Sequence, residues 1–201
     1  MKILINENQF KLIVEQEGFD ELAVKMSETY PDSVYLLSFI KNFVEKSGCK
    51  KVDIEPMAYQ ALGLSLMDKV VINEKVLKSP LSEFLYVLLH EIAHQYQYKK
   101  YGIDKMYGIY TGNVSLDDGA KFMNYTEKVA DDFAVRKLRE INKLFGDKVK
   151  IDINIEKVYD NIPFQHYKNL IEFFTKKIKD SNYKNKEEIS TILYNYVKNG
   201  K

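Results

Sequence analysis

Apolar side chains recur every three or four positions along much of the chain, which is the spacing that gives a helix one buried face. The run from Leu36 to Val44 is a clear example, and Ser47 and Gly48 end it. Capping residues, glycines and prolines set the other boundaries. On this basis we expect helices at about residues 6–16, 20–29, 33–47, 80–98, 120–144, 163–179 and 186–198.

Other segments alternate in polarity or are rich in β-branched residues, and they predict short strands. We expect strands over Lys51–Glu55, Met57–Leu62 and Leu66–Asn73, with Gly63 separating the last two. The glycine-rich stretch 101–119 is expected to be a loop. Two further short strands are expected at about residues 2–5 and 149–155.

The composition narrows the class of protein. The chain has 201 residues, 45% hydrophobic and 29% charged, which fits one globular domain with or without an appendage. Thirty basic residues against 29 acidic ones give a net charge of +1, so a nucleic-acid partner is not expected. No apolar run approaches the roughly 20 residues of a membrane span, and Cys49 has no second cysteine to bond. We therefore expect a cytoplasmic protein with no signal peptide and no membrane partner.

Two of the three histidines, His90 and His94, lie four residues apart in the strongest of the expected helices. Side chains at positions i and i+4 project from the same helical face, so both imidazoles can reach one metal ion. Glu91 lies beside them, where it can hold a metal-bound water. The H-E-x-x-H spacing is typical of catalytic Zn²⁺ sites, in which three protein ligands leave a fourth position for water.

A third ligand is needed, and the sequence offers three candidates. Glu127 lies on a later expected helix, and Asp131, one turn further on, can accept a hydrogen bond from the free N–H of a ligating histidine. Asp104 lies ten residues after His94 and could fold back onto the metal. His166 is the remaining histidine, and it is a better candidate for a hydrogen-bond donor to a substrate carbonyl than for a metal ligand.

The segments HEIAH (90–94) and EKVADDFA (127–134) together resemble the gluzincin type of zincin metallopeptidase. The second segment is similar to that of the ImmA/IrrE-like peptidases, which phages and mobile elements often encode. The resemblance covers about residues 66–138. It implies the zinc ligands His90, His94 and Glu127, the catalytic base Glu91 and the supporting carboxylate Asp131.

A competing ligand scheme comes from residues 104–108, whose D-x-x-Y-G pattern resembles part of the aspzincin signature. In that scheme Asp104 is the third ligand and Tyr107 assists the transition state. The metzincin pattern is not matched, because Gln97 and Lys100 stand where it has glycine and histidine.

The gluzincin resemblance also implies a fold. We expect a zincin-like α+β fold with a small, mainly antiparallel sheet packed on the H-E-x-x-H helix, and additional N- and C-terminal helices. Residues 1–150 are expected to form the metallopeptidase domain with an N-terminal helical extension, and residues 151–201 a helical appendage packed on it. The strand Lys69–Asn73 resembles the zincin edge strand that pairs with an extended substrate.

The implied function is hydrolysis of a peptide or protein substrate by a zinc-bound water that Glu91 activates. A second donor to the oxyanion is expected from Tyr107, Tyr110 or His166. The alternatives are a non-catalytic zincin-fold protein that binds or regulates a partner, and a virion-associated structural protein. The intact Glu91 favours the peptidase, because a purely structural metal site needs no base.

Overall fold

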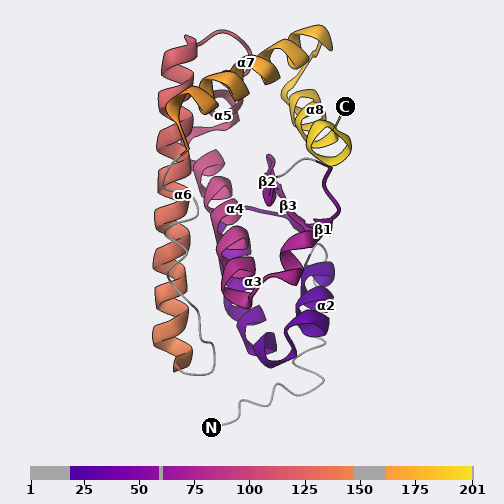
Figure 1. Cartoon of the computed structure of the whole chain (residues 1–201), viewed down its shortest axis with the longest axis vertical. Coiled ribbons are helices and arrows are strands. Elements are labelled where there is room, and N and C mark those ends of the chain that lie inside the picture. Colours follow the sequence, from indigo (N-terminus) through magenta and orange to yellow (C-terminus); the bar gives the residue numbers. More distant parts are fainter. Residues whose placement is uncertain (1–18, 59–60, 147–161, 201) are drawn as a thin grey trace.

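The computed structural model describes residues 19–58, 61–146 and 162–200, and within this part the fold is α+β, with long helices around one small sheet (Figure 1). The helices are α2 (Asp20–Thr29), α3 (Leu37–Ser47), α4 (Leu81–Tyr101), α5 (Ile103–Gly108), α6 (Leu116–Phe145), α7 (Phe164–Asp180) and α8 (Lys186–Asn199). Short 3-10 helices cover Pro31–Leu36 (η1) and Glu74–Lys78 (η2). The strands are β1 (Lys51–Glu55), β2 (Gly63–Ser65) and β3 (Lys69–Asn73).

The sheet is mixed, with β3 in the middle and the strand order β1–β3–β2. The five-residue ladder between β1 and β3 is parallel, and the three-residue ladder between β2 and β3 is antiparallel. The expectation of a mainly antiparallel sheet is therefore wrong for the longer ladder. The expectation that Lys69–Asn73 is an edge strand is also wrong, because β3 has a partner on each side and the edges belong to β1 and β2.

Both faces of β3 are covered, which explains why its apolar residues are consecutive rather than alternating. Val70 and Ile72 belong to the main core with α2, α3, α4 and α6. Val71 faces the other way and packs with Val197 of α8. The site helix α4 is itself buried over most of its length, from Phe84 to Gln97. The sheet and α6 therefore hold α4 from different sides.

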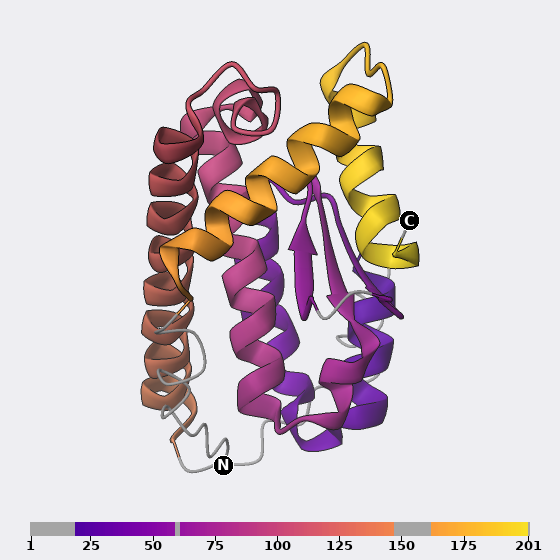
Figure 2. The same ribbon diagram turned by 45° about the horizontal axis from the view of Figure 1, so that its top comes forward.

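The helices α4 and α6 pack along each other, and α7 crosses from α6 toward α8 (Figures 1 and 2). Among the described residues, three ion pairs join the C-terminal helices to the rest of the chain, and each pairs a lysine of α7 or α8 with an acidic residue elsewhere. These pairs are Lys168 with Asp117, Lys186 with Asp104, and Lys198 with Glu55.

Most expected elements have the observed type, and the differences concern the region 101–119, the surroundings of Gly63 and the start of the helix expected at 33–47. The region 101–119 is not a continuous loop, because α5 lies within it and α6 begins at Leu116. Gly63 does not separate two strands but opens β2, and no strand covers the described residues of Met57–Leu62. The helix expected at 33–47 begins as η1 and becomes α-helical at Leu37.

The elements expected at residues 2–5, 6–16 and 149–155 lie outside the described residues. Among the helices that the structure does describe, none combines the length and the apolar character needed to cross a membrane.

Candidate metal centre

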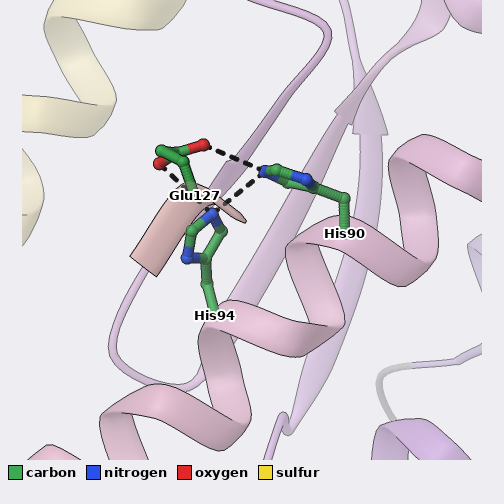
Figure 3. Close-up of side chains that lie close together, drawn as sticks. All are labelled: His90, His94 and Glu127. Atoms are coloured by element: carbon green, nitrogen blue, oxygen red, sulfur yellow. Dashed lines mark hydrogen bonds and ion pairs between the residues drawn. The ribbon is translucent and has the colours of Figure 1, made fainter. Parts of the chain in front are cut away.

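His90 and His94 lie one turn apart on the buried face of α4, and both point toward Glu127 of α6 (Figure 3). His90 Nε2 is 3.2 Å from Oε2 of Glu127, and His94 Nε2 is 3.5 Å from Oε1 of the same carboxylate. The two Nε2 atoms are 3.1 Å apart. The packing of α4 along α6 therefore brings together two ligands from one helix and one from another.

A hydrogen-bond chain fixes the orientation of His90. Its Nδ1 lies 2.8 Å from Oδ1 of Asp131, one turn after Glu127 on α6. Since a carboxylate only accepts, Nδ1 carries the hydrogen and donates it, which leaves the Nε2 lone pair facing Glu127. The hydroxyl of Tyr86 donates to the same Asp131 oxygen at 2.6 Å. Asp131 thus orients His90, and Tyr86 holds Asp131 in turn.

A second chain of hydrogen bonds fixes His94. Its Nδ1 lies 2.9 Å from Oε1 of Gln97. The amide nitrogen of Gln97 donates to the backbone carbonyl of Thr126 at 2.7 Å. That donation assigns Oε1 as the acceptor of the His94 Nδ1–H, so the His94 Nε2 lone pair also faces the site. Because Thr126 precedes Glu127, Gln97 connects one ligand to the backbone that carries another.

The converging atoms form a set that suits a cation. The Nε2 atoms of the two imidazoles and the carboxylate of Glu127 lie within 4.8 Å of one another, and with both Nδ1 atoms donating elsewhere, neutral imidazoles would have no hydrogen to donate into the site. Such a set is favourable only around a proton or a metal ion. Burial lowers the pKa of His90, but hydrogen bonds to Asp131 and Glu127 outweigh burial and raise it to about 10. Burial raises the pKa of Glu127, but the two histidines outweigh burial and hold it below its usual range.

Glu91 lies between the histidines and the sheet. Its side chain is buried, and burial raises its pKa, while the charges of His90 and His94 oppose that rise. It fits against β2 at Gly63, where a Cβ atom would lie 2.6 Å from Cγ and 2.7 Å from Oε1 of Glu91. A side chain at position 63 would therefore collide with the carboxylate.

A cavity of about 260 Å³ lies beside these residues. Its polar side is formed by His90, His94, Glu127 and Glu91, and β2 borders it. Most of the remaining lining is apolar. It comprises Ala61, Tyr98 of α4, Thr126 of α6, and a group from the region of α5 to α8: Met106, Ile109, Tyr110, Phe122, Met123, Leu170, Phe174, Leu193 and Val197.

The other candidates from the sequence are not brought to the histidine pair. The Asp104 side chain is 78% exposed and pairs with Lys186, so the aspzincin-like ligand scheme has no support in the described residues. The physical reason is that only Gly102 separates α4 from α5, and the direction of this short helix places Asp104 on the outer surface. His166 is exposed on α7, and neither it nor Tyr107 lines the cavity. Tyr107 packs against Tyr98 instead.

Among the three candidate oxyanion donors, only Tyr110 lines the cavity. Burial raises the pKa of Tyr110, and the nearby charge of Glu127 raises it further. Tyr167 of α7 was not expected near the site. Burial and the charges of Glu127 and Asp131 raise its pKa to about 12.

Sequence reasoning also missed Tyr86, Gln97 and Gly63. The first two carried a usable signal, because Tyr86 lies four residues before His90 and Gln97 three residues after His94, on the same helical face. Gly63 carried none, since only the packing of β2 on α4 shows what it contacts.

No protein-family model, curated protein or solved structure matches the chain. Its function must therefore be inferred from its own residues and from the geometry around His90, His94 and Glu127.

Proposed function

We propose that the chain is a zinc-dependent peptidase, in which His90, His94 and Glu127 would hold the metal and Glu91 is the general base. The observation that supports this most is the composition of the site: two imidazoles and one carboxylate converge, with a second, buried carboxylate beside them. Two histidines and a glutamate, with a fourth position left for water, are a ligand set of catalytic zinc sites rather than of closed structural ones.

When bound, zinc would polarise both the attacking water and the substrate carbonyl. Glu91 would take the proton that this water loses and then give it to the leaving amine. The place of Glu91 between His90 and β2 suits that role, because a carboxylate there lies next to the ligands without being one of them. Asp131 and Gln97 hold the two imidazoles so that each Nε2 faces the site.

The edge of β2 is the place where an extended substrate would bind. In an antiparallel ladder alternate residues direct their backbone groups to the partner strand. The bonds from Asn73 N to Leu62 O and from Leu66 N to Lys69 O set this alternation. The backbone groups of Gly63 and Ser65 therefore point away from β3, and of these the Ser65 carbonyl already accepts a hydrogen bond from the Tyr98 hydroxyl at 3.3 Å, which a pairing peptide would have to replace. A peptide added there by strand pairing would lie beside Glu91, which moves the expected substrate edge from β3 to β2.

Tyr110 is the proposed donor to the oxyanion that forms at the carbonyl. We expect Tyr110→Phe to lower kcat about 100-fold, the usual effect of removing one such donor, with little change in zinc content. Tyr107→Phe is the matched control, because Tyr107 does not line the cavity. Equal losses in the two variants would remove Tyr110 from the mechanism.

The proposed function is tested by measuring bound metal and hydrolysis together. The purified protein should contain about one zinc per chain by elemental analysis and cleave peptides from a mixed-sequence library. Glu91→Gln should keep the zinc and lose hydrolysis. Glu127→Ala should lose zinc, and Asp104→Ala should keep both, because Asp104 is exposed, pairs with Lys186 and does not belong to the group of His90, His94 and Glu127.

Three outcomes separate the alternatives. A protein that binds no zinc contradicts the proposal outright. Zinc binding without hydrolysis of any library member favours a non-catalytic binding protein. Loss of zinc in Asp104→Ala, with retention in Glu127→Ala, would restore the aspzincin-like scheme.

A further inference from the structure

The cavity beside the candidate metal ligands is lined partly by polar and partly by apolar side chains. One side carries the histidines, Glu127 and Glu91, and β2 forms its border. To the rest of the lining the C-terminal helices contribute only apolar side chains, namely Leu170 and Phe174 from α7 and Leu193 and Val197 from α8. The candidate metal ligands and an apolar wall therefore line the same cavity. The wall comes from α7 and α8, which lie outside the part of the chain that carries the H-E-x-x-H motif and Glu127.

The size of the cavity fits a large side chain. A single water needs a cavity of about 10–15 Å³, whereas this one measures about 260 Å³. A polar or charged side chain directed at Leu170, Phe174 and Leu193 would find no hydrogen-bond partner among these three residues, and burying it there would cost free energy that an apolar side chain does not lose.

The position of the apolar wall next to the β2 edge indicates what kind of ligand would bind in the cavity. An extended chain on the β2 edge passes Glu91, and its side chains alternate between the two faces of the sheet. One of them would face the cavity, because Gly63, Leu64 and Ser65 of β2 all line it. A ligand that reaches the apolar wall from this edge is therefore a peptide whose backbone runs past the candidate base.

We infer that α7 and α8 form the specificity pocket of this site, and that the pocket selects peptide substrates with a large apolar residue next to the scissile bond. This inference rests on the proposed peptidase function and adds a substrate class to it. Leu170 is the residue best placed to test it, because it lines the cavity and is only partly buried, so that it can be changed without removing a core residue.

The main experiment compares kcat/KM across peptides that differ at one position beside the cleaved bond. We expect Leu, Met or Phe to be preferred over Asp, Lys or Gly by 10-fold or more, within the range that apolar pockets achieve. Leu170→Phe should shift the preference toward smaller apolar residues, and Leu170→Ala toward larger ones, each by about 10-fold and with unchanged zinc content. The same two substitutions at Leu144, which is 59% exposed on α6, are the matched controls and should shift nothing.

A binding measurement tests the pocket without turnover. The chain has no tryptophan, so a tryptophan in a short capped peptide reports its own environment by fluorescence. The peptide should bind Glu91→Gln with a blue shift. A Leu-containing peptide should displace it at least 10-fold better than the matching Asp peptide, and Leu170→Phe should weaken the binding.

The failure of this inference can be told apart from the failure of the proposed function. Hydrolysis without an apolar preference, or a preference that both Leu170 variants leave unchanged, overturns the pocket and leaves the peptidase standing. Absence of hydrolysis together with selective, Leu170-dependent binding overturns the peptidase and supports an apolar peptide pocket. Absence of both hydrolysis and binding overturns both.

Discussion

Gly63 is the point at which the sheet touches the candidate base. A methyl group there would lie 2.6 Å from Cγ and 2.7 Å from Oε1 of Glu91, well inside van der Waals contact. We therefore expect Gly63→Ala to displace Glu91 and to lower kcat about 100-fold or more, because misplacement by about 1 Å can cost that much. Zinc content should stay near that of the unaltered chain, since the ligands are elsewhere.

Gly108→Ala is the control for this prediction. A Cβ atom at Gly108 meets nothing within 4 Å, so the same added methyl group should leave hydrolysis unchanged. The prediction is measured with kcat on a cleaved library peptide and with elemental analysis of zinc. Retention of full activity in Gly63→Ala would mean that Glu91 does not act from the position seen here.

Gln97 is predicted to control metal affinity through His94. It is buried and makes two contacts, one to His94 Nδ1 and one to the Thr126 carbonyl. Gln97→Leu keeps a side chain of similar size but loses both hydrogen bonds, so zinc affinity should fall about 10–100-fold, as for other residues that orient a ligand. Competition with a chromophoric chelator measures the affinity. Gln165→Leu, at an exposed glutamine of α7 that bonds only Asn169 among the described residues, should leave it unchanged.

Sequence reasoning can predict which site residues of one helix lie together, but it cannot predict which residues of different helices do. Helix geometry fixes which side chains share a face, so His90 with His94, and Glu127 with Asp131, could be paired from spacing alone. Contacts between helices have no such local rule. Asp104 has suitable chemistry and a plausible spacing, and only the direction of α5 shows that it faces outward.

Among the elements, the helices were easier to predict than the sheet. The helix α2 and the strand β1 have the expected bounds, because capping and apolar periodicity are local signals. The strand β2 has three residues and begins at a glycine, so its pattern is too short to distinguish from a turn. The central place of β3 follows from pairing with both β1 and β2, which no single segment encodes.

The attachment of α8 to the sheet should make stability depend on pH. Glu55 of β1 accepts hydrogen bonds from Tyr194 at 2.7 Å and from Lys198, both on α8, and from Lys69 at 3.3 Å. Burial raises the pKa of Glu55, but these bonds and the Lys69 charge outweigh burial and lower it from 4.5 to about 2. The ionised carboxylate therefore stabilises the fold above pH 4.5, and this contribution is lost as the pH falls through about 2.

Urea unfolding at several pH values measures this contribution. At pH 7 the Glu55→Gln variant should be less stable than the unaltered chain by about 1–2 kcal/mol, a figure kept small because solvent screens the pair. The difference should shrink steadily below pH 4.5. Glu28→Gln, at an exposed glutamate of α2, should give no comparable difference at any pH. A Glu55→Gln effect that is equal at pH 7 and pH 3 would show that the carboxylate charge is not what holds α8.

For the molecule as a whole, the candidate ligands join helices that are distant along the chain. His90 and His94 are on α4, whereas Glu127 is on α6, 33 residues after His94. A metal held by all three would add a cross-link between α4 and α6, which run along the long axis of the structure (Figure 1). Since the unfolded chain does not present the three ligands together, zinc should bind the folded state far more tightly and so stabilise it.

This stabilisation can be measured as a change in melting temperature between zinc-loaded and chelator-treated protein. Free zinc at 1,000 times its Kd stabilises a fold by about 4 kcal/mol, and for a chain of this size that corresponds to a rise in Tm of about 10 °C. Glu127→Ala should lose most of the rise, whereas Asp104→Ala should keep it, because only Glu127 faces both histidines. Mg²⁺ should have little effect, since imidazole ligands favour zinc over magnesium. An equal rise in Glu127→Ala would mean that α4 alone binds the metal, and that α6 is held to α4 by packing without a shared ion.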